Sequence, residues 1–198
     1  MKKVLFALMA VATLASVSHA LTVVDFEGLP DANYYFGGNT NLGGYYAGLN
    51  FGADATILDQ AIYGYNSGGY PPHSGDAVLF SVSDPVIRVD FSSATNHAEL
   101  WYTTATDLWL EAYDSGNNLL TSSTAGGSNY GSNSFLDVNW GSNSIAYVLI
   151  HDTGDFFTVD DFGWEDTGGH PVPEPTTVLL MASGLLGMGG ISRFRRKS

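Results

Sequence analysis

The sequence predicts an all-β protein, built as an antiparallel β-sandwich of two sheets. Residues 21–170 of the 198-residue chain contain 24 aromatic residues and 20 glycines, and few runs of the residues that favour helices. Short β-branched and aromatic stretches alternate there with clusters of Gly, Asn, Ser and Asp, a spacing typical of a sandwich. The expected strands are residues 22–27, 77–83, 86–91, 97–103, 107–113, 135–140, 145–151 and 156–164.

The hydrophobic pattern predicts which strand faces are buried. In residues 86–91, Ile87, Val89 and Phe91 alternate with Arg88 and Asp90, so one face points to the core and the other to solvent. Residues 145–150 are apolar at every position, as in a central strand covered on both sides or a strand inside the sandwich beneath a loop. Residues 114–117 predict a hairpin turn between strands 108–113 and 119–123.

Two segments rich in Gly, Asn and Tyr, residues 30–50 and 64–75, lack strand alternation. We expect ordered loops there, because their tyrosines need a place to pack, and such loops often carry binding groups on a rigid scaffold.

The N-terminal 20 residues have the pattern of a secretory signal peptide. Lys2 and Lys3 precede an apolar stretch over residues 4–17, and the small residues Ser18 and Ala20 close the segment. We expect cleavage after Ala20 and export of the chain that follows.

The C-terminal segment has a second targeting pattern. Pro173, Glu174 and Pro175 precede an apolar run over residues 178–191, and a basic cluster follows. At about 1.5 Å per residue the run spans only about 21 Å, less than a hydrocarbon core of about 30 Å. The basic residues favour a cytoplasmic tail. We therefore predict a weak, transient anchor in the inner membrane.

This tail resembles the PEP-CTERM sorting signal of Gram-negative bacteria, whose members are recognised by exosortase in bacteria that make exopolysaccharide. The resemblance implies that Pro173, Glu174 and Pro175 are the recognition motif, and that the cytoplasmic stop consists of Arg193, Arg195 and Arg196. The expected organisation is a signal peptide (1–20), a passenger domain (21–167), a linker with the motif (168–177), and a transmembrane segment with a basic tail (178–198).

The passenger resembles the jelly-roll domains that often precede such tails and that are similar to carbohydrate-binding modules. The resemblance rests on residues 24–27, 44–51, 73–76, 110–114 and 157–162. It implies a jelly-roll-like sandwich whose first and last strands adjoin, with a structural calcium ion near the carboxylates of those strands.

Calcium takes six to eight oxygen ligands, which separate strands must bring together. Glu27 would meet Asp160 or Asp161 if the first and last strands pair, and Asp25 and Asp155 are further candidates. The alternative for the adjacent pair Asp160 and Asp161 is a solvated position near a strand end.

Charge and missing motifs exclude several functions. The chain has 7 Lys and Arg against 20 Asp and Glu, and residues 21–170 contain 19 acidic residues and a single basic one, Arg88. Such a surface repels nucleic acids. The chain lacks cysteine, a G-x-S-x-G nucleophile motif and paired histidines at zinc spacing. We therefore do not expect an enzyme.

The sequence predicts binding of a neutral glycan, because sugar rings stack on exposed aromatics and an anionic polysaccharide would be repelled. Trp109 and Tyr113 share a strand face with Glu111. The other candidates are loop tyrosines, namely Tyr45, Tyr46, Tyr65 and Tyr70. For any single aromatic residue, packing in the core or between loops is the alternative.

Together these patterns predict a non-catalytic protein at the cell surface or in the exopolysaccharide matrix. The alternatives are a secreted hydrolase acting on polysaccharide and a self-associating structural protein of the matrix.

Overall fold

The computed structural model describes residues 21–29, 42–63, 67–82, 84–154 and 156–165. Within these ranges the chain forms eleven strands and one short helix. In chain order they are β1 (Leu21–Val24), β2 (Leu49–Phe51), β3 (Ala55–Asp59), α1 (Gln60–Tyr63), β4 (Ala77–Ser81), β5 (Val86–Thr95), β6 (His97–Thr104), β7 (Leu108–Tyr113), β8 (Leu119–Ala125), β9 (Ser134–Asn139), β10 (Ile145–His151) and β11 (Phe157–Glu165).

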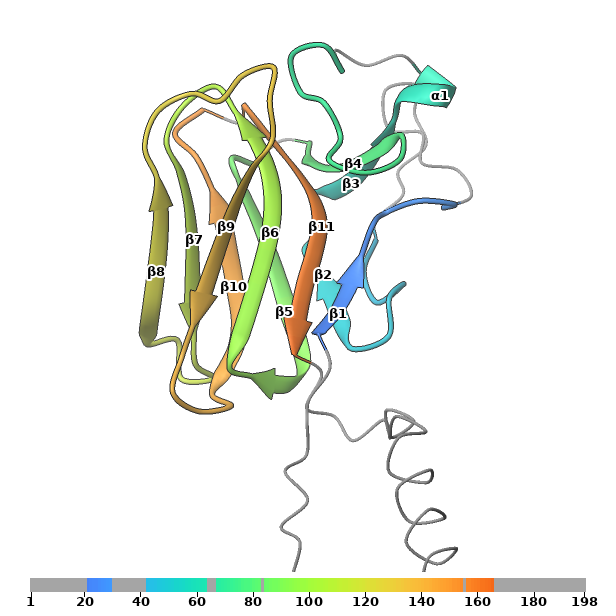
Figure 1. The fold of residues 1–198 in the computed structure, drawn as a ribbon. Helices are drawn as coiled ribbons and strands as arrows, with labels where there is room; N and C mark the ends of the chain where they lie inside the picture. The colour runs from blue at the N-terminus through green and yellow to red at the C-terminus, as the bar shows by residue number, and fades with distance from the viewer. Residues whose placement is uncertain (1–20, 30–41, 64–66, 83, 155, 166–198) are drawn as a thin grey trace, which may run out of the picture.

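The strands form two antiparallel sheets that pack face to face (Figure 1). The six-stranded sheet has the order β3-β4-β11-β6-β9, with β1 also paired to β11. The five-stranded sheet has the order β2-β5-β10-β7-β8. The prediction of an all-β, two-sheet sandwich is therefore confirmed. The expected signal helix and C-terminal transmembrane helix lie outside the described residues.

Most strand predictions are confirmed to within a few residues, and the exceptions are instructive. β2 and β3 were not predicted, because β2 has only three residues and follows a glycine-rich segment. β1 ends at Val24 instead of continuing to Glu27, because Phe26 has a positive φ of 60° that an extended strand does not allow.

The hairpin between β7 and β8 forms as predicted. Within the turn, Asn117 has a positive φ of 63°. The carboxylate of Asp114 accepts hydrogen bonds from the amides of Gly116 and Asn118, each at 2.8 Å. Its bonds to the side chain and backbone of Asn118 lower the pKa of Asp114.

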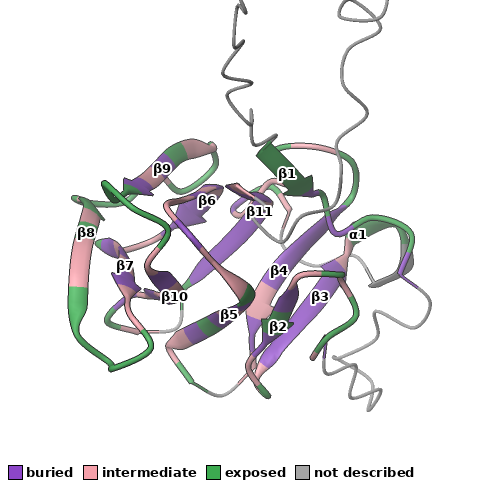
Figure 2. Cartoon of the chain, turned by 90° about the horizontal axis from the view of Figure 1, so that it is seen from below, coloured by how far each residue is buried: buried purple, intermediate pink, exposed green. Residues whose placement is uncertain are grey.

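The core lies between the two sheets and follows the predicted alternation. Ile87, Val89 and Phe91 are buried, whereas Arg88 is exposed. β10 lies between β5 and β7, so residues 145–150 form a central strand of the sheet, but Leu149 on its outer side is only partly buried. Figure 2 shows buried stretches running through strands of both sheets.

The first and last strands adjoin, as the jelly-roll resemblance implies. β1 pairs with β11 in a register that places Leu21 opposite Glu165 and Val24 opposite Phe162. The two ends of the described domain therefore lie side by side (Figure 1). Among the described segments, no helix has the length and apolar character needed to cross a membrane.

Candidate functional site

The outer surface of the five-stranded sheet carries a row of aromatic and charged side chains on three central strands, which we call the open face. Its members are Arg88 and Asp90 on β5, Tyr147, Leu149 and His151 on β10, and Trp109, Glu111 and Tyr113 on β7. The register places Tyr147 opposite Tyr113, Leu149 opposite Glu111, and His151 opposite Trp109. All of its members lie on strands, and none comes from the loops in which the sequence predicted binding tyrosines.

One half of the open face is a stack of three side chains that crosses the sheet. The guanidinium carbon of Arg88 lies 3.6 Å from the ring centroid of Tyr147. The rings of Tyr147 and Tyr113 are parallel to within 4°, with centroids 5.0 Å apart. Tyr147 is consequently only 6% exposed, and its hydroxyl donates to Oδ1 of Asn117 at 3.1 Å. The stack is therefore fixed in place before any ligand arrives.

The other half pairs Trp109 with His151, whose rings stack with centroids 5.4 Å apart. Glu111 connects the two halves, because its Oε2 accepts a hydrogen bond from the Tyr113 hydroxyl at 2.6 Å and lies 3.5 Å from Nε2 of His151. This hydrogen bond, followed by burial, raises the pKa of Tyr113 to about 12. The Tyr113 hydroxyl therefore keeps its proton at neutral pH.

The charges beside the stack are also paired. Nε of Arg88 donates to Oδ2 of Asp90 at 2.9 Å, and this hydrogen bond is the main cause that raises the pKa of Arg88. Arg88 is the single basic residue of the passenger. The open face thus combines aromatic surface, carboxylates and a guanidinium on neighbouring strands. Its two carboxylates, Asp90 and Glu111, each accept a hydrogen bond from a side chain of the same face.

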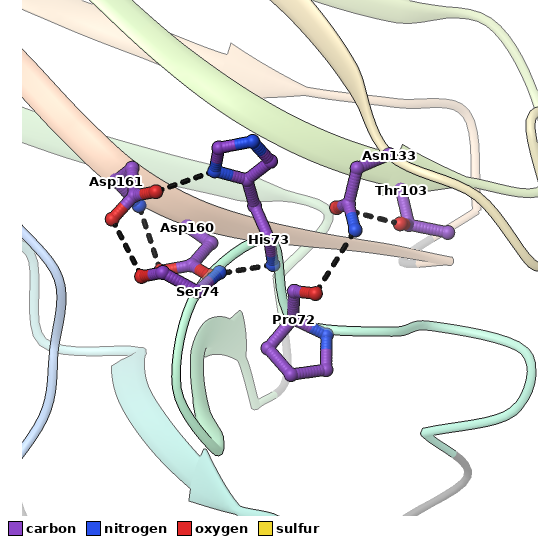
Figure 3. A network of polar contacts seen from close by, with 7 residues as sticks. All are labelled: Pro72, His73, Ser74, Thr103, Asn133, Asp160 and Asp161. Carbon is purple, nitrogen blue, oxygen red and sulfur yellow. Dashed lines mark hydrogen bonds and ion pairs between the residues drawn. The ribbon is translucent and has the colours of Figure 1, made fainter.

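The outer surface of the six-stranded sheet differs, because residues 67–77 lie against it. Oδ2 of Asp160 accepts hydrogen bonds from the amides of His73 at 2.7 Å and Ser74 at 2.8 Å (Figure 3). Its Oδ1 accepts from the amide of Asp161 at 2.7 Å. Asp160 is 1% exposed, and burial raises its pKa to about 6.

His73 and Ser74 add side-chain contacts to this junction. The imidazole of His73 stacks on Trp101 with centroids 3.6 Å apart, and its Nδ1 lies 2.5 Å from Oδ2 of Asp161. The Ser74 hydroxyl donates to Oδ1 of Asp161 at 2.8 Å. Further along the loop, the Asn133 amide donates to the carbonyl of Pro72 at 3.0 Å (Figure 3). The loop that contains His73 is therefore held by β6, by β11 and by Asn133, which precedes β9.

Glu27 holds the end of the same loop. Its Oε1 accepts hydrogen bonds from the amides of Asp76 at 2.8 Å and Ala77 at 2.7 Å. Gly75 has a φ of 54°, and a Cβ at this position would collide with the Glu27 carboxylate. Glu27 and Asp160 therefore contact the same segment, residues 73–77, whereas a direct approach of Glu27 to Asp160 or Asp161 stays a prediction.

These contacts bear on the predicted calcium ligands. In the described ranges, no group of three or more His, Cys, Asp or Glu side chains could hold a metal ion. The oxygens of Glu27, Asp160 and Asp161 named above accept hydrogen bonds, and Oδ1 of Asp25 accepts from the Glu27 amide at 3.2 Å. Asp155 lies outside the described residues. These oxygens would have to give up their hydrogen bonds to bind a calcium ion, and calcium binding stays a prediction.

The loop tyrosines fall into different environments. Tyr45 is exposed and meets Tyr46 edge-on, whereas the ring of Tyr46 packs against Phe26 of the core. The Tyr46 hydroxyl is buried without a hydrogen-bond partner among the described residues, and burial raises its pKa. Tyr70 meets Tyr130 edge-on with centroids 5.2 Å apart. Tyr65 lies outside the described residues.

Sequence reasoning left five members of the open face out of the candidate site: Arg88, Asp90, Tyr147, Leu149 and His151. The alternation of β10 could have grouped Tyr147, Leu149 and His151 on one face. Their pairing with Trp109 and Tyr113 depends on strand order, which that alternation does not encode.

The fold has likenesses among solved structures at low identity. The K2 cleaved adhesin domain of Lys-gingipain is 14% identical, with a TM-score of 0.47, and the match covers 73% of this chain and 97% of that one. The K1 cleaved adhesin domain of Lys-gingipain from Porphyromonas gingivalis W83 is 13% identical, with a TM-score of 0.40. This match also covers 73% of this chain and 97% of that one. TmCBM61, solved in complex with β-1,4-galactotriose, is 11% identical with a TM-score of 0.33, over 63% of this chain and 90% of that one.

These values are too low to assign a function to this chain. The chain has no match among curated proteins.

The class defined by the fold is an all-β sandwich of two antiparallel sheets. Residues 171–197 match the PEP-CTERM protein-sorting motif, which contains Pro173, Glu174 and Pro175. The chain therefore carries the sorting motif that the sequence predicted, and this motif indicates an exported protein that is sorted at the cell surface. The motif residues themselves lie outside the described structure.

Proposed function

We propose that this protein is a non-catalytic surface protein that binds a neutral glycan on the open face. The observation that carries the proposal is the arrangement of Trp109, Tyr113 and Glu111 on one rigid strand, beside His151 of the next strand. Aromatic rings offer stacking surface for a sugar ring, while the carboxylate and imidazole offer hydrogen-bond partners for its hydroxyls.

The net charge supports a neutral rather than an anionic ligand. Nineteen acidic residues against Arg88 in residues 21–170 give the passenger a strongly negative field. A neutral polysaccharide of the extracellular matrix meets no such repulsion. Because the sorting motif indicates export, we further propose that the glycan belongs to the exopolysaccharide outside the cell.

The sorting partner in this proposal is an exosortase-type enzyme of the inner membrane of a Gram-negative bacterium. The PEP-CTERM match supports this partner. Replacing Glu174 and its two flanking prolines with alanine should leave the unprocessed chain in the inner membrane, as detected by fractionation and a shift in apparent mass. Normal processing of that variant would contradict this part of the proposal.

Binding and catalysis are separated by one pair of assays on the full chain in a zwitterionic detergent, which avoids sugar headgroups. Affinity electrophoresis through a panel of soluble neutral polysaccharides should retard the wild-type protein, and release of reducing ends should stay at background. Trp109→Ala should lose at least about tenfold in affinity, as for aromatic hot spots. Trp140→Ala is the matched control, because Trp140 is an exposed tryptophan outside the open face.

No retardation in any polysaccharide would overturn the proposal. Release of reducing ends would favour the hydrolase alternative, and concentration-dependent light scattering without retardation would favour self-association.

A further inference from the structure

A second group of exposed aromatic side chains lies on the loops at one end of the sandwich. Tyr130 and Phe156 are each 53% exposed, and Tyr70 is half-buried beside Tyr130. We call Tyr70, Tyr130 and Phe156 the loop-end cluster. None of the three belongs to the open face.

The arrangement of Tyr70 and Tyr130 is fixed by backbone contacts. The two rings meet edge-on at an interplanar angle of 86°. The Tyr130 ring lies directly on the backbone of Gly69, where a Cβ would collide with it, and the Gly131 amide donates to the Gly69 carbonyl at 2.8 Å. Two separate loops are therefore locked together with the Tyr130 ring exposed, a pre-organised geometry that reduces the entropy cost of binding.

Asp152 connects Phe156 to the same end of the molecule. Its Oδ2 accepts hydrogen bonds from the Phe156 amide at 2.9 Å and from the Thr106 hydroxyl at 3.1 Å. Burial, then the neighbouring Tyr130 and Asp152, raise the pKa of Tyr70, so its hydroxyl stays protonated. The protonated Tyr70 hydroxyl thus belongs to the same cluster as the exposed Tyr130 ring.

The surroundings of Tyr130 match a sugar better than an apolar protein surface. Its neighbours along the chain are small and polar, namely Ser128, Asn129, Gly131, Ser132 and Asn133. Their hydroxyl and amide side chains hydrogen-bond within the protein, so the exposed Tyr130 ring lies beside Tyr70 among small polar residues. A protein interface core would instead need contiguous apolar surface.

The position of the cluster relative to the chain exits gives it a role. Phe156 precedes β11, and Glu165 ends it, nine residues and about 30 Å away at about 3.3 Å per residue. Leu21 is paired with Glu165, so both ends of the domain leave from the side opposite the cluster (Figure 1). The sorting motif at residues 171–197 follows Glu165 in the chain.

We propose that the loop-end cluster is a second contact surface for a neutral polysaccharide and that it points away from the membrane while the chain is tethered by its tail. The class of ligand rests on the proposed function, whereas the site is independent of the open face. A single domain would then contact the matrix at two places, one on its side and one at its outer end.

The test is affinity electrophoresis of the full chain in zwitterionic detergent, through the same panel of neutral polysaccharides. The double variant Tyr130→Ala with Phe156→Ala should lose about tenfold or more in affinity, while Trp140→Ala, at an exposed tryptophan outside the cluster, should bind as the wild type does. Tyr130→Phe should keep most of the affinity, because it retains the stacking ring. An unchanged melting temperature confirms that the variants fold.

A second variant tests the geometry without removing an aromatic ring. Gly69→Ala should displace the Tyr130 ring and reduce affinity in the same direction. If the double variant and Gly69→Ala bind as the wild type does while Trp109→Ala loses affinity, the loop-end proposal is overturned and the proposed function stands. If the wild-type chain binds no polysaccharide of the panel, both are overturned.

Discussion

The outer faces of the two sheets carry the same chemical trio in two different settings. On the five-stranded sheet, Trp109 stacks with His151, which lies 3.5 Å from Glu111. On the six-stranded sheet, Trp101 stacks with His73, which lies 2.5 Å from Asp161. Each trio is a tryptophan, a histidine and a carboxylate, and both trios are partly exposed, but they join different segments of the chain.

The difference comes from the origin of the histidine. His151 belongs to a strand that neighbours the strand of Trp109, so that trio needs no other segment. His73 belongs to a loop, and its contacts fasten residues 67–77 to β6 and β11. The same residue types therefore fasten a loop to the sheet on one face and lie within neighbouring strands on the other. Substitutions on the two faces should separate these roles.

The largest effect on stability is expected for Asp160→Ala. The change leaves the amides of His73, Ser74 and Asp161 without their acceptor, and we expect the free energy of unfolding to fall by about 2–4 kcal/mol. Glu111→Ala on the open face is the matched control, with an expected loss below about 1 kcal/mol. Urea unfolding of both variants measures the difference, and equal losses would contradict the division of roles.

The second effect is a pH dependence due to Asp160 in the calcium-free protein. Its folded pKa is about 6 against 3.8 for the ordinary group, so the folded state binds the extra proton between these values. The free energy of unfolding therefore falls as pH rises through this window, by at most about 3 kcal/mol at about 1.4 kcal/mol per pH unit. Above pH 6 this contribution is constant.

Asp160→Asn isolates that contribution, because other carboxylates with lowered pKa values, such as Asp114, act in the opposite direction. With a chelator present, the difference in unfolding free energy between wild type and Asp160→Asn should change between pH 4 and pH 6. If this difference in unfolding free energy stays constant between pH 4 and pH 6, the pKa of Asp160 is not raised by its burial.

Much of this architecture could be predicted from sequence, because it depends on local patterns. The alternation of Ile87, Val89 and Phe91 identified a buried face, and the apolar run of β10 identified a central strand. The contact of His73 with Asp161 spans 88 positions and depends on where a loop folds back, which no local pattern encodes. The predicted ligands Glu27 and Asp160 do meet one segment, but through its amides.

A smaller effect is expected for Gly75→Ala, at the end of the loop that covers the six-stranded sheet. The positive φ of 54° and the collision of Cβ with Glu27 should together lower the free energy of unfolding by about 1–2 kcal/mol. Gly127→Ala separates the two causes, because Gly127 also has a positive φ, 82°, but open space around it. If thermal unfolding shows that Gly127→Ala loses as much stability as Gly75→Ala or more, the contact with Glu27 does not contribute to the effect at Gly75.

The last expected effect, similar in size to that of Gly75→Ala, is that of calcium. If Glu27 and Asp160 exchange amide hydrogens for the ion, a titration to ten times the dissociation constant should stabilise the fold by about 1.4 kcal/mol. The rise in melting temperature should saturate, and Glu27→Ala and Asp160→Ala should abolish it. A flat titration at millimolar calcium would contradict the prediction and leave loop fastening as the role of these carboxylates.

The most direct test of the central claim uses the four tryptophans as reporters of four regions. Trp109 lies on the open face, Trp101 on the covered face beneath His73, Trp164 in the core, and Trp140 is exposed after β9. Fluorine NMR of the full chain labelled with 5-fluorotryptophan, assigned by single Trp→Phe variants, follows each during titration with a retained polysaccharide. The Trp109 signal should shift in a saturable way while those of Trp101 and Trp164 stay in place. A saturable shift at Trp101 with none at Trp109 would contradict the assignment of the open face as the binding surface.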